Sequence, residues 1–340
     1  MNSVVRGLKS IAMAGVVSVA AVSSVWAADF VAKIGHLEAA QQSRHVHLEK
    51  VAALVAERTN GAVEFQIFPQ GQLGQQREMT EGVQLGTLEA TVAPAAFLGG
   101  FNPVVSILDI PFLLPDNDEQ AQKIRSGAFG KALCDTFTSR GVHCVTLWPN
   151  GKKHFTSNRP LANVGDFAGQ KFRVMDSNIL IEQFNALGAS AIAMPFGELY
   201  TALQTGVIDA QENPMDTIQR MKYYEVQKHL VVSDHGAMED VVLFNPTFWN
   251  SLPAEYQTVI TDAFVEVVPE LIVHKAESVK AALEEIKASG IDVREMEAAE
   301  KAEFREKMYP ATRAAFLSRT GDEGQSLISI YEEEYASVAK

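Results

Sequence analysis

The alternation of apolar and polar residues predicts that strands and helices follow one another along the chain. Apolar side chains alternate with polar ones from Val63 to Ile67, as in a half-buried strand. The preceding segment, Ser43 to Thr59, repeats apolar residues at helical spacing, and Asn60-Gly61 predicts its end. Phe30 to His36 is an earlier apolar segment of strand length. This β-α-β order predicts neighbouring parallel strands.

The segment from Gly169 to Pro214 repeats this order. Lys171 to Met175 has the length of a strand, and Asp176 and Ser177 are both suitable N-caps for a helix that runs to Leu187. A second helix is predicted from Phe196 to Leu203, and Gly206 is placed to end it. The chain then enters the sheet at Val207-Ile208 and leaves it at Gln211-Glu212-Asn213.

Two polar residues of this segment are candidates for binding a ligand. Arg173 lies inside an apolar strand, where a charge is costly unless it is paired. Ligands of open α/β sheets bind beyond the carboxyl ends of the strands, so Arg173 and Asn213 are expected to face one cleft. The alternative for Arg173 is a structural salt bridge to one of the many acidic residues.

The rest of the pattern predicts how the chain passes between two domains. The regular pattern breaks at Trp148 to Lys153, which indicates a crossing, and Val241 to Asn245 forms a returning strand. A helical run extends from Pro253 to Ser289, and Pro269 should kink it. The tail, Ile291 to Lys340, is expected to supply a further strand and helices.

The N-terminus and the charge indicate an exported protein. Arg6 and Lys9 precede an apolar run from Ile11 to Val22, which predicts a secretory signal peptide cut after Ala27. The whole chain carries 29 basic and 42 acidic residues, a net charge of −13. Such an acidic protein is a poor candidate for binding nucleic acid or an anionic membrane surface. At 340 residues with 47% hydrophobic content, two domains are expected.

The two cysteines leave two possibilities open. Cys134 lies late in a helix-like run, and Cys144 lies in the strand from Val142 to Leu147. An exported protein can hold a disulfide, so a helix-to-strand bridge is possible. Two buried thiols are the alternative. The spacing fits neither a metal site nor a redox motif, and no metal is expected.

Three linked motifs carry a resemblance to a known family. They are Gly169-Gln170-Lys171-Phe172-Arg173, the run from Pro195-Phe196-Gly197-Glu198 to Gly206, and Asp209-Ala210-Gln211-Glu212-Asn213-Pro214. In this order they resemble the solute-binding proteins of tripartite ATP-independent periplasmic (TRAP) transporters, closest to the DctP-type, C4-dicarboxylate-binding branch. The resemblance extends over nearly all of the chain after the signal peptide.

The resemblance implies the fold and the division of the chain. It implies an α/β, two-lobe periplasmic binding protein (class II-like) with mixed or parallel sheets in each lobe and a long helix spanning both. The division expected is 1–27 signal peptide, 28–150 plus 239–278 lobe I, and 151–238 plus 279–340 lobe II.

The resemblance also implies the binding residues. Arg173 corresponds to the family's bidentate carboxylate clamp, and Lys153 to a second cationic contact, although its neighbour Lys152 makes that position ambiguous by one residue. For His36, a structural role competes with ligand contact. The ligand-binding residues expected are Arg173, Asn213, Lys153, Phe196, His36, Gln72, Ala93, Pro94 and His235.

The implied function is capture of a small organic acid in the periplasm and delivery to the small and large TRAP membrane subunits. The solute expected first is a C4-dicarboxylate such as malate, succinate or fumarate. Met175-Asp176 departs from the glutamine-containing motif that commonly follows the arginine in that branch. This leaves a uronate, another sugar acid, or a 2-oxo or hydroxy monoacid as alternatives. No cofactor is implied, and a monomer is expected. The rival classes are an exported enzyme, for which the common catalytic motifs are missing, and a ligand sensor or scaffold.

Overall fold

The computed structural model describes residues 28–338, so the predicted signal peptide lies outside the described residues. One sheet of nine strands carries the fold, in the order β2-β1-β3-β8-β4-β7-β5-β6, with β9 paired to β8. The strands are β1 Phe30–Gly35, β2 Val63–Phe68, β3 Ala90–Pro94, β4 His143–Ser157, β5 Lys171–Val174, β6 Ser190–Ala193, β7 Ala210–Pro214, β8 His229–Phe244 and β9 Asp292–Glu295.

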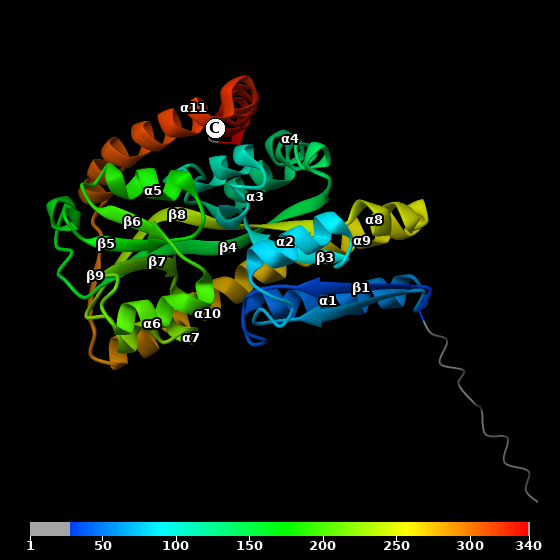
Figure 1. The fold of residues 1–340 in the computed structure, drawn as a ribbon, viewed down its shortest axis with the longest axis horizontal. Coiled ribbons are helices and arrows are strands. Elements are labelled where there is room, and N and C mark those ends of the chain that lie inside the picture. The colour runs from blue at the N-terminus through cyan, green and yellow to red at the C-terminus, as the bar shows by residue number, and fades with distance from the viewer. Residues whose placement is uncertain (1–27, 339–340) are drawn as a thin grey trace, which may run out of the picture.

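Helices cover both faces of this sheet (Figure 1). They are α1 Ser43–Arg58, α2 Gln76–Leu85, α3 Asp118–Ser126, α4 Ala128–Asp135, α5 Asn178–Asn185, α6 Leu199–Gln204, α7 Met215–Arg220, α8 Pro246–Ser251, α9 Ala254–Glu266, α10 Val268–Ala288 and α11 Ala298–Val338. The mixed α/β class predicted from the sequence is confirmed. No helix within residues 28–338 combines the length and apolar character needed to cross a membrane.

Two long antiparallel strands, β4 and β8, join the two ends of the molecule (Figure 1). Their pairing runs from His143 opposite Phe244 to Ser157 opposite His229, with a register shift between Pro149 and Lys152. The crossing predicted at Trp148 to Lys153 is therefore a bulged stretch of continuous strand, not an end of the sheet. We call the part around β1, β2 and β3 lobe I, and the part around β5, β6 and β7 lobe II.

Lobe I contains the predicted β-α-β unit. Strand β1 pairs in parallel with both β2 and β3, and β3 pairs antiparallel with β8. Trp148 and Phe264 lie in the core between this sheet and the helices α1 and α9, and the Trp148 indole donates a hydrogen bond to the Phe264 carbonyl over 2.8 Å. The apolar face of the predicted helix from Ser43 is thus buried, as its spacing indicated.

Lobe II repeats the arrangement with β5 between β6 and β7, all parallel. Of the two predicted N-caps, it is Ser177 that caps α5, by accepting a hydrogen bond from the Leu180 amide. Val207 and Ile208 differ from the prediction, because they belong to the turn after Gly206 and the strand begins only at Ala210. The four rings of Phe155, Phe167, Phe172 and Phe184 form the aromatic centre of this lobe's core.

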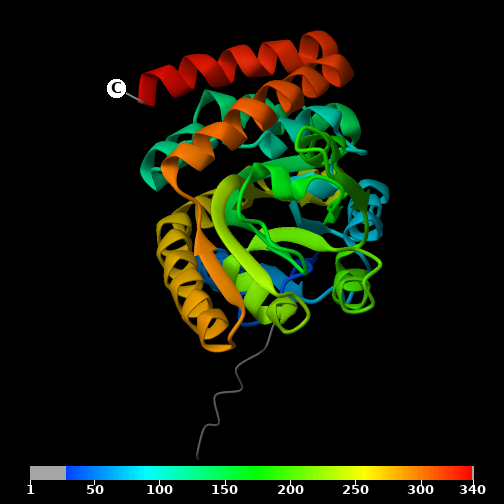
Figure 2. The same cartoon turned by 90° about the vertical axis from the view of Figure 1, so that its left-hand side faces the viewer.

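The long helical run predicted from Pro253 divides in two. Helix α9 ends at Glu266 and α10 starts at Val268, so Pro269 occupies the first turn of α10, where its missing amide costs no intrahelical bond. Helix α10 packs against α1 of lobe I and α7 of lobe II, so it connects both lobes. Helix α11 lies over α3, α4 and α5 on the opposite side of the sheet and is broken at Gly321 (Figure 2).

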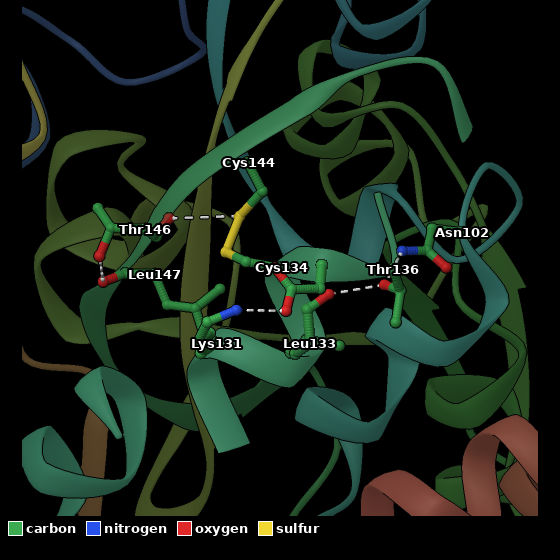
Figure 3. The surroundings of a disulfide bond; sticks show 9 residues. Asn102, Lys131, Leu133, Cys134, Thr136, Cys144, Thr146 and Leu147 are labelled. Atoms are coloured by element: carbon green, nitrogen blue, oxygen red, sulfur yellow. Dashed lines mark hydrogen bonds and ion pairs between the residues drawn. A yellow bond between two sulfur atoms is a disulfide. The ribbon is translucent and has the colours of Figure 1, made fainter. Parts of the chain in front are cut away.

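A disulfide joins Cys134 in α4 to Cys144 in β4, with Cα atoms 5.1 Å apart (Figure 3). Of the two possibilities left open by the sequence, the structure therefore has the helix-to-strand bridge. The bridge ties α4 to the start of the strand that runs into lobe II.

Candidate functional site

Two adjoining hollows lie between the lobes, one of about 250 Å³ and a narrower one of about 20 Å³. Both are lined by Leu37, Phe97 and Phe196, so we treat them as one site, the inter-lobe cleft. The narrower hollow is lined by Leu37, Glu38, Arg44, Pro94, Phe97, Met175, Phe196, Asn213, Thr217 and Met238. Side chains of both lobes therefore meet across it.

The Arg173 guanidinium lies beside the wall of this cleft. Its Nε and Nη2 donate to the Met194 carbonyl over 3.0 and 2.6 Å, and its Cζ lies 5.9 Å from the centre of the Phe97 ring. Met194 and Phe97 both line the cleft. The side chain is fully buried, and Nη1 has no hydrogen-bond partner. Within residues 28–338, no carboxylate lies within ion-pair distance of Arg173.

A buried cation without a carboxylate partner is costly for the free protein. Burial accordingly lowers the pKa of Arg173 to about 10. A ligand carboxylate placed against Nη1 and Nη2 would supply the missing charge and the missing acceptor together, in the two parallel bonds that a guanidinium favours. The structural salt bridge considered as the alternative for Arg173 is absent from the described part of the chain.

Asn213 lies near the end of β7 and lines the cleft. Its amide nitrogen donates to Gln211, whose own amide nitrogen donates to the Thr156 hydroxyl over 2.9 Å. Thr156 donates in turn to Gln227 over 3.0 Å, and the Gln227 amide donates to the backbone carbonyls of Asp209 and Val226. Asn213 is therefore the cleft end of a continuous buried hydrogen-bond chain.

Lys153 differs from its expected position. Its ammonium donates to Glu212 over 2.6 Å, and both side chains are almost fully buried. Successive residues of a strand point to opposite faces, so Glu212 lies on the face of β7 opposite Asn213. Lys153 is thus engaged within lobe II, and Lys152, the other candidate, pairs with Asp116. Neither lysine lines the inter-lobe cleft.

His235 belongs to the same internal cluster. It bonds to the second oxygen of Glu212 over 2.6 Å and to the Ser233 hydroxyl over 2.7 Å, and its ring stacks on Phe155 at 3.8 Å. Burial lowers the pKa of His235. Although burial acts to raise the pKa of Glu212, Lys153 and the bond from His235 hold it at about 2. This cluster satisfies its own charges.

A second buried cluster lies on the lobe I side of the cleft. Arg44 binds Asp240 through two bonds of 2.7 Å, and its Nη2 is 3.5 Å from Glu38 Oε1. The Asn150 amide donates to the same Glu38 oxygen over 2.8 Å. Lys275, paired with Asp216 at 2.7 Å, adds its charge near Glu38. Motif reading missed Glu38 and Arg44, because neither belongs to a phrase that carried the resemblance.

The remaining predicted residues take different positions. Phe196 lines both hollows, and Pro94 lines the narrower one. Ala93 is buried in β3, and Gln72 is exposed in the turn after β2. His36 is buried, and its Nε2 lies 3.1 Å from His45 Nδ1, which is the structural role weighed against ligand contact.

Tyr223 is a further residue that the sequence did not single out. It is fully buried, its hydroxyl has no hydrogen-bond partner, and burial raises its pKa. The Arg173 charge acts on Tyr223 in the opposite direction, which places the two groups in one electrostatic environment.

A larger hollow of about 280 Å³ lies elsewhere, between the bulge of β4, helix α10 and the loop before α3. Its buried charges are already paired, Arg125 with Glu239 and Lys275 with Asp216. Burial lowers the pKa of His154 in its wall to about 4. The inter-lobe cleft is the better candidate because it adjoins the one buried arginine of lobe II that lacks an acidic partner among residues 28–338.

Comparisons with known proteins identify the family of this chain. The family described as bacterial extracellular solute-binding protein, family 7, matches residues 34–319. The C4-dicarboxylate-binding periplasmic protein DctP of Rhodobacter capsulatus is 34% identical over 82% of this chain and 84% of its own length.

Two solved structures share the fold. A TRAP periplasmic solute-binding protein from Desulfovibrio salexigens, solved with bound orotic acid, is 63% identical, covers 91% of this chain and 99% of its own, and has a TM-score of 0.90. The periplasmic ectoine-binding protein of the TeaABC TRAP transporter from Halomonas elongata is 26% identical, covers 90% and 99%, and has a TM-score of 0.85.

Proposed function

The chain belongs to the bacterial extracellular solute-binding proteins of family 7, and from this premise we propose that its solute is a small carboxylate with a single negative charge, orotate being the first candidate. The resemblance predicted from the motifs is confirmed, and the protein is a TRAP transport component, not an enzyme. Which solute it carries is the subject of the proposal.

The observation that carries the proposal is the uncompensated charge of Arg173. Its guanidinium is fully buried beside the cleft with one nitrogen unpartnered, and residues 28–338 place no acid against it. Lys153 and Arg44, two other buried cations near the cleft, already pair with Glu212 and Asp240. One negative charge on the ligand therefore balances Arg173, and a carboxylate fits the fork of the guanidinium.

Orotate fits this description better than a C4-dicarboxylate. Its one carboxylate can meet Arg173, and its flat ring suits a cleft with Phe97 and Phe196 in its walls. The 63% identical Desulfovibrio salexigens protein was solved with bound orotic acid, which supports orotate as the first candidate.

A C4-dicarboxylate is the second candidate, favoured by the DctP relative of Rhodobacter capsulatus. It brings a second charge that requires its own cation. Lys153, the cation expected for that role, would first have to leave Glu212, and breaking a buried pair of this kind costs several kcal/mol, about 3–5. This objection does not apply to sugar acids that carry one charge.

The setting proposed for this function is the periplasm, with a signal peptide removed near Ala27 and a monomer that closes on its solute. Relatives of the family are periplasmic and work with membrane subunits. We propose that this chain delivers its solute to the small and large membrane subunits of a TRAP transporter.

Isothermal titration calorimetry of the purified protein with orotate and with succinate tests the proposal. We expect saturable binding of orotate, at least about tenfold tighter than succinate, and loss of more than tenfold in Arg173→Ala, because a buried carboxylate would lose its partner. Arg220→Ala, an exposed arginine on α7, is the matched control. Tight succinate binding with none of orotate would favour the dicarboxylate, and unchanged binding in Arg173→Ala would remove the clamp.

A further inference from the structure

We infer that Glu38 of lobe I recognises an N–H donor on the edge of the ligand opposite its carboxylate, and that Asn213 of lobe II recognises a second donor beside the carboxylate. The inference rests on the proposed function and names what the cleft requires beyond one negative charge. It follows from the two oxygens that these residues present, and from the charges around them.

The Glu38 carboxylate uses only one of its oxygens. Oε1 accepts from Asn150 over 2.8 Å and lies 3.5 Å from the Arg44 guanidinium, while Oε2 is buried and has no hydrogen-bond partner. Glu38 lines the narrower hollow together with Phe97 and Asn213. A buried acceptor without a donor is costly, so a ligand that donates to it gains more than one that does not.

The charges around Glu38 exclude a second anionic group there. Three acids, Glu38, Asp240 and Asp216, share two cations, Arg44 and Lys275, in this cluster. A ligand carboxylate at this end would face a set that already has an excess of acids, and like charges at close range repel strongly where water is scarce. A neutral or positively charged N–H group at this end would instead be attracted by the excess of negative charge.

The direction of the hydrogen-bond chain to Asn213 can be worked out from its far end. The carbonyls of Asp209 and Val226 only accept, so the Gln227 amide nitrogen faces them and its oxygen faces Thr156. The Thr156 hydroxyl then donates to Gln227 and accepts from the Gln211 nitrogen. The Gln211 oxygen consequently accepts from the Asn213 nitrogen, which turns Asn213 Oδ1 away from Gln211.

Asn213 therefore presents an acceptor on the side away from Gln211, and it lines the cleft. Asn213 and Arg173 lie on neighbouring parallel strands, β7 and β5, so a ligand carboxylate at Arg173 and a donor at Asn213 belong to the same end of the ligand. Glu38 lies across the cleft in lobe I. The ligand that matches has a carboxylate, an adjacent N–H, and a further N–H across the ring.

Orotate has this arrangement. Its carboxylate is on C6, N1–H is next to it, and N3–H is directly opposite across the ring. We assign N1–H to Asn213 and N3–H to Glu38, so that the ring joins the two lobes. Succinate and fumarate have no donor at neutral pH for either oxygen and would leave both acceptors unsatisfied, while malate offers a single hydroxyl and would leave at least one of them so.

A ligand series on the unaltered protein is the first test, because it needs no variant to fold. We expect 3-methylorotate and 1-methylorotate to bind at least about tenfold more weakly than orotate in calorimetry, since each lacks one N–H. The 5-methyl derivative is the matched control, with equal bulk on carbon and both donors intact. Equal weakening by all three would assign the effect to size and overturn the inference.

The variant Glu38→Gln tests the residue itself. Asn150 donates to the Oε1 position and the Arg44 guanidinium lies 3.5 Å from it, so the amide oxygen of glutamine takes that place and its NH₂ group takes the place of Oε2. The acceptor thus becomes a donor. We expect orotate to bind at least about tenfold more weakly, and isonicotinate, which has an acceptor nitrogen opposite its carboxylate, to bind more tightly than to the wild type.

The opposite changes expected for orotate and isonicotinate distinguish a Glu38 that contacts the ligand from a Glu38 that only holds the buried charge cluster together. Glu57→Gln, the same change at an exposed position of α1, should leave both affinities unchanged. If Glu38→Gln weakens orotate and isonicotinate alike, or changes neither while Arg173→Ala abolishes binding, Glu38 does not recognise the ligand and the proposed function still holds. If the wild type does not bind orotate at all, the proposed solute fails, and this inference fails with it.

Discussion

Replacing Arg173 by methionine should stabilise the free protein while abolishing solute binding. The guanidinium is fully buried, has no carboxylate partner in residues 28–338, and leaves Nη1 without a hydrogen bond. Methionine fills much of the same volume without a charge, and replacing buried charges by apolar groups is often neutral or stabilising. The binding site of the free protein should therefore be a source of instability.

The size of the effect follows from the pKa of the group. Burial lowers the pKa of Arg173 from 12.5 to about 10, and each unit corresponds to about 1.4 kcal/mol, so the charge costs the folded state about 3 kcal/mol at neutral pH. The two bonds to the Met194 carbonyl are lost in the variant and offset about 1–2 kcal/mol of this. We expect the free energy of unfolding of Arg173→Met to rise by about 1–2 kcal/mol.

Urea unfolding with and without orotate measures the stability of the free protein and the stabilisation that the ligand adds. Without ligand the variant should be the more stable protein. With orotate at about 100 times its dissociation constant, the wild type should gain about 2.7 kcal/mol and the variant nothing, so the order should reverse. Arg220→Met, at an exposed position, should shift neither curve. A free variant less stable than the wild type by more than about 1 kcal/mol would mean that Arg173 is a structural brace, and the reasoning would be refuted.

Three further predictions concern the rest of the fold. The Cys134→Ser, Cys144→Ser double variant should lose about 2–3 kcal/mol of unfolding free energy while its affinity for orotate stays unchanged. Titration of the unfolded, unreduced wild type with a thiol reagent should find no free thiol, and two free thiols would exclude the bridge. Burial raises the pKa of Asp109, which accepts a hydrogen bond from Ser177, to about 7, so the folded state keeps a proton that the unfolded state releases from about pH 4. The free energy of unfolding should therefore fall by up to about 1.4 kcal/mol per pH unit as the pH rises to 7. The variant Asp109→Asn should remove this slope from a series of urea titrations at different pH values. Small-angle X-ray scattering should show a smaller radius of gyration on saturation with orotate, and an unchanged radius would contradict closure of the two lobes.

The elements of the fold could be predicted because their signals are local. The helix from Ser43 to Arg58 and the strand from Val63 show the two periods of burial that separate helix from strand, and Ser177 caps its helix with its own side chain. The continuity of β4 through Trp148 to Lys153 could not be predicted in the same way. It depends on pairing with β8, about ninety residues later, which holds the strand together across a bulge that looks like a break in sequence.

The two cations expected to bind the ligand show what the motifs could not predict. Arg173 and Lys153 are both cationic residues in family-like motifs, and although the sequence favours Arg173, it predicts a ligand contact for each. What separates them is the partner that each finds in the fold: Glu212 for Lys153, and no acid within the described chain for Arg173. A sequence with 42 acidic residues offers a possible partner to every cation, so only three-dimensional pairing identifies the one charge left for a ligand.

The orientation of the side-chain amides is even harder to predict from the sequence. Asparagine can donate or accept, and the residue type at position 213 does not say which group faces the cleft. Its direction is fixed by a chain through Gln211, Thr156 and Gln227 that ends on two backbone carbonyls, which can only accept. A relative could keep Arg173 and Asn213, change Gln227, and present the opposite group to its solute. With the proposed assignment, relatives that share Arg173 would therefore differ in their solutes, and residues that never touch the ligand would take part in choosing it.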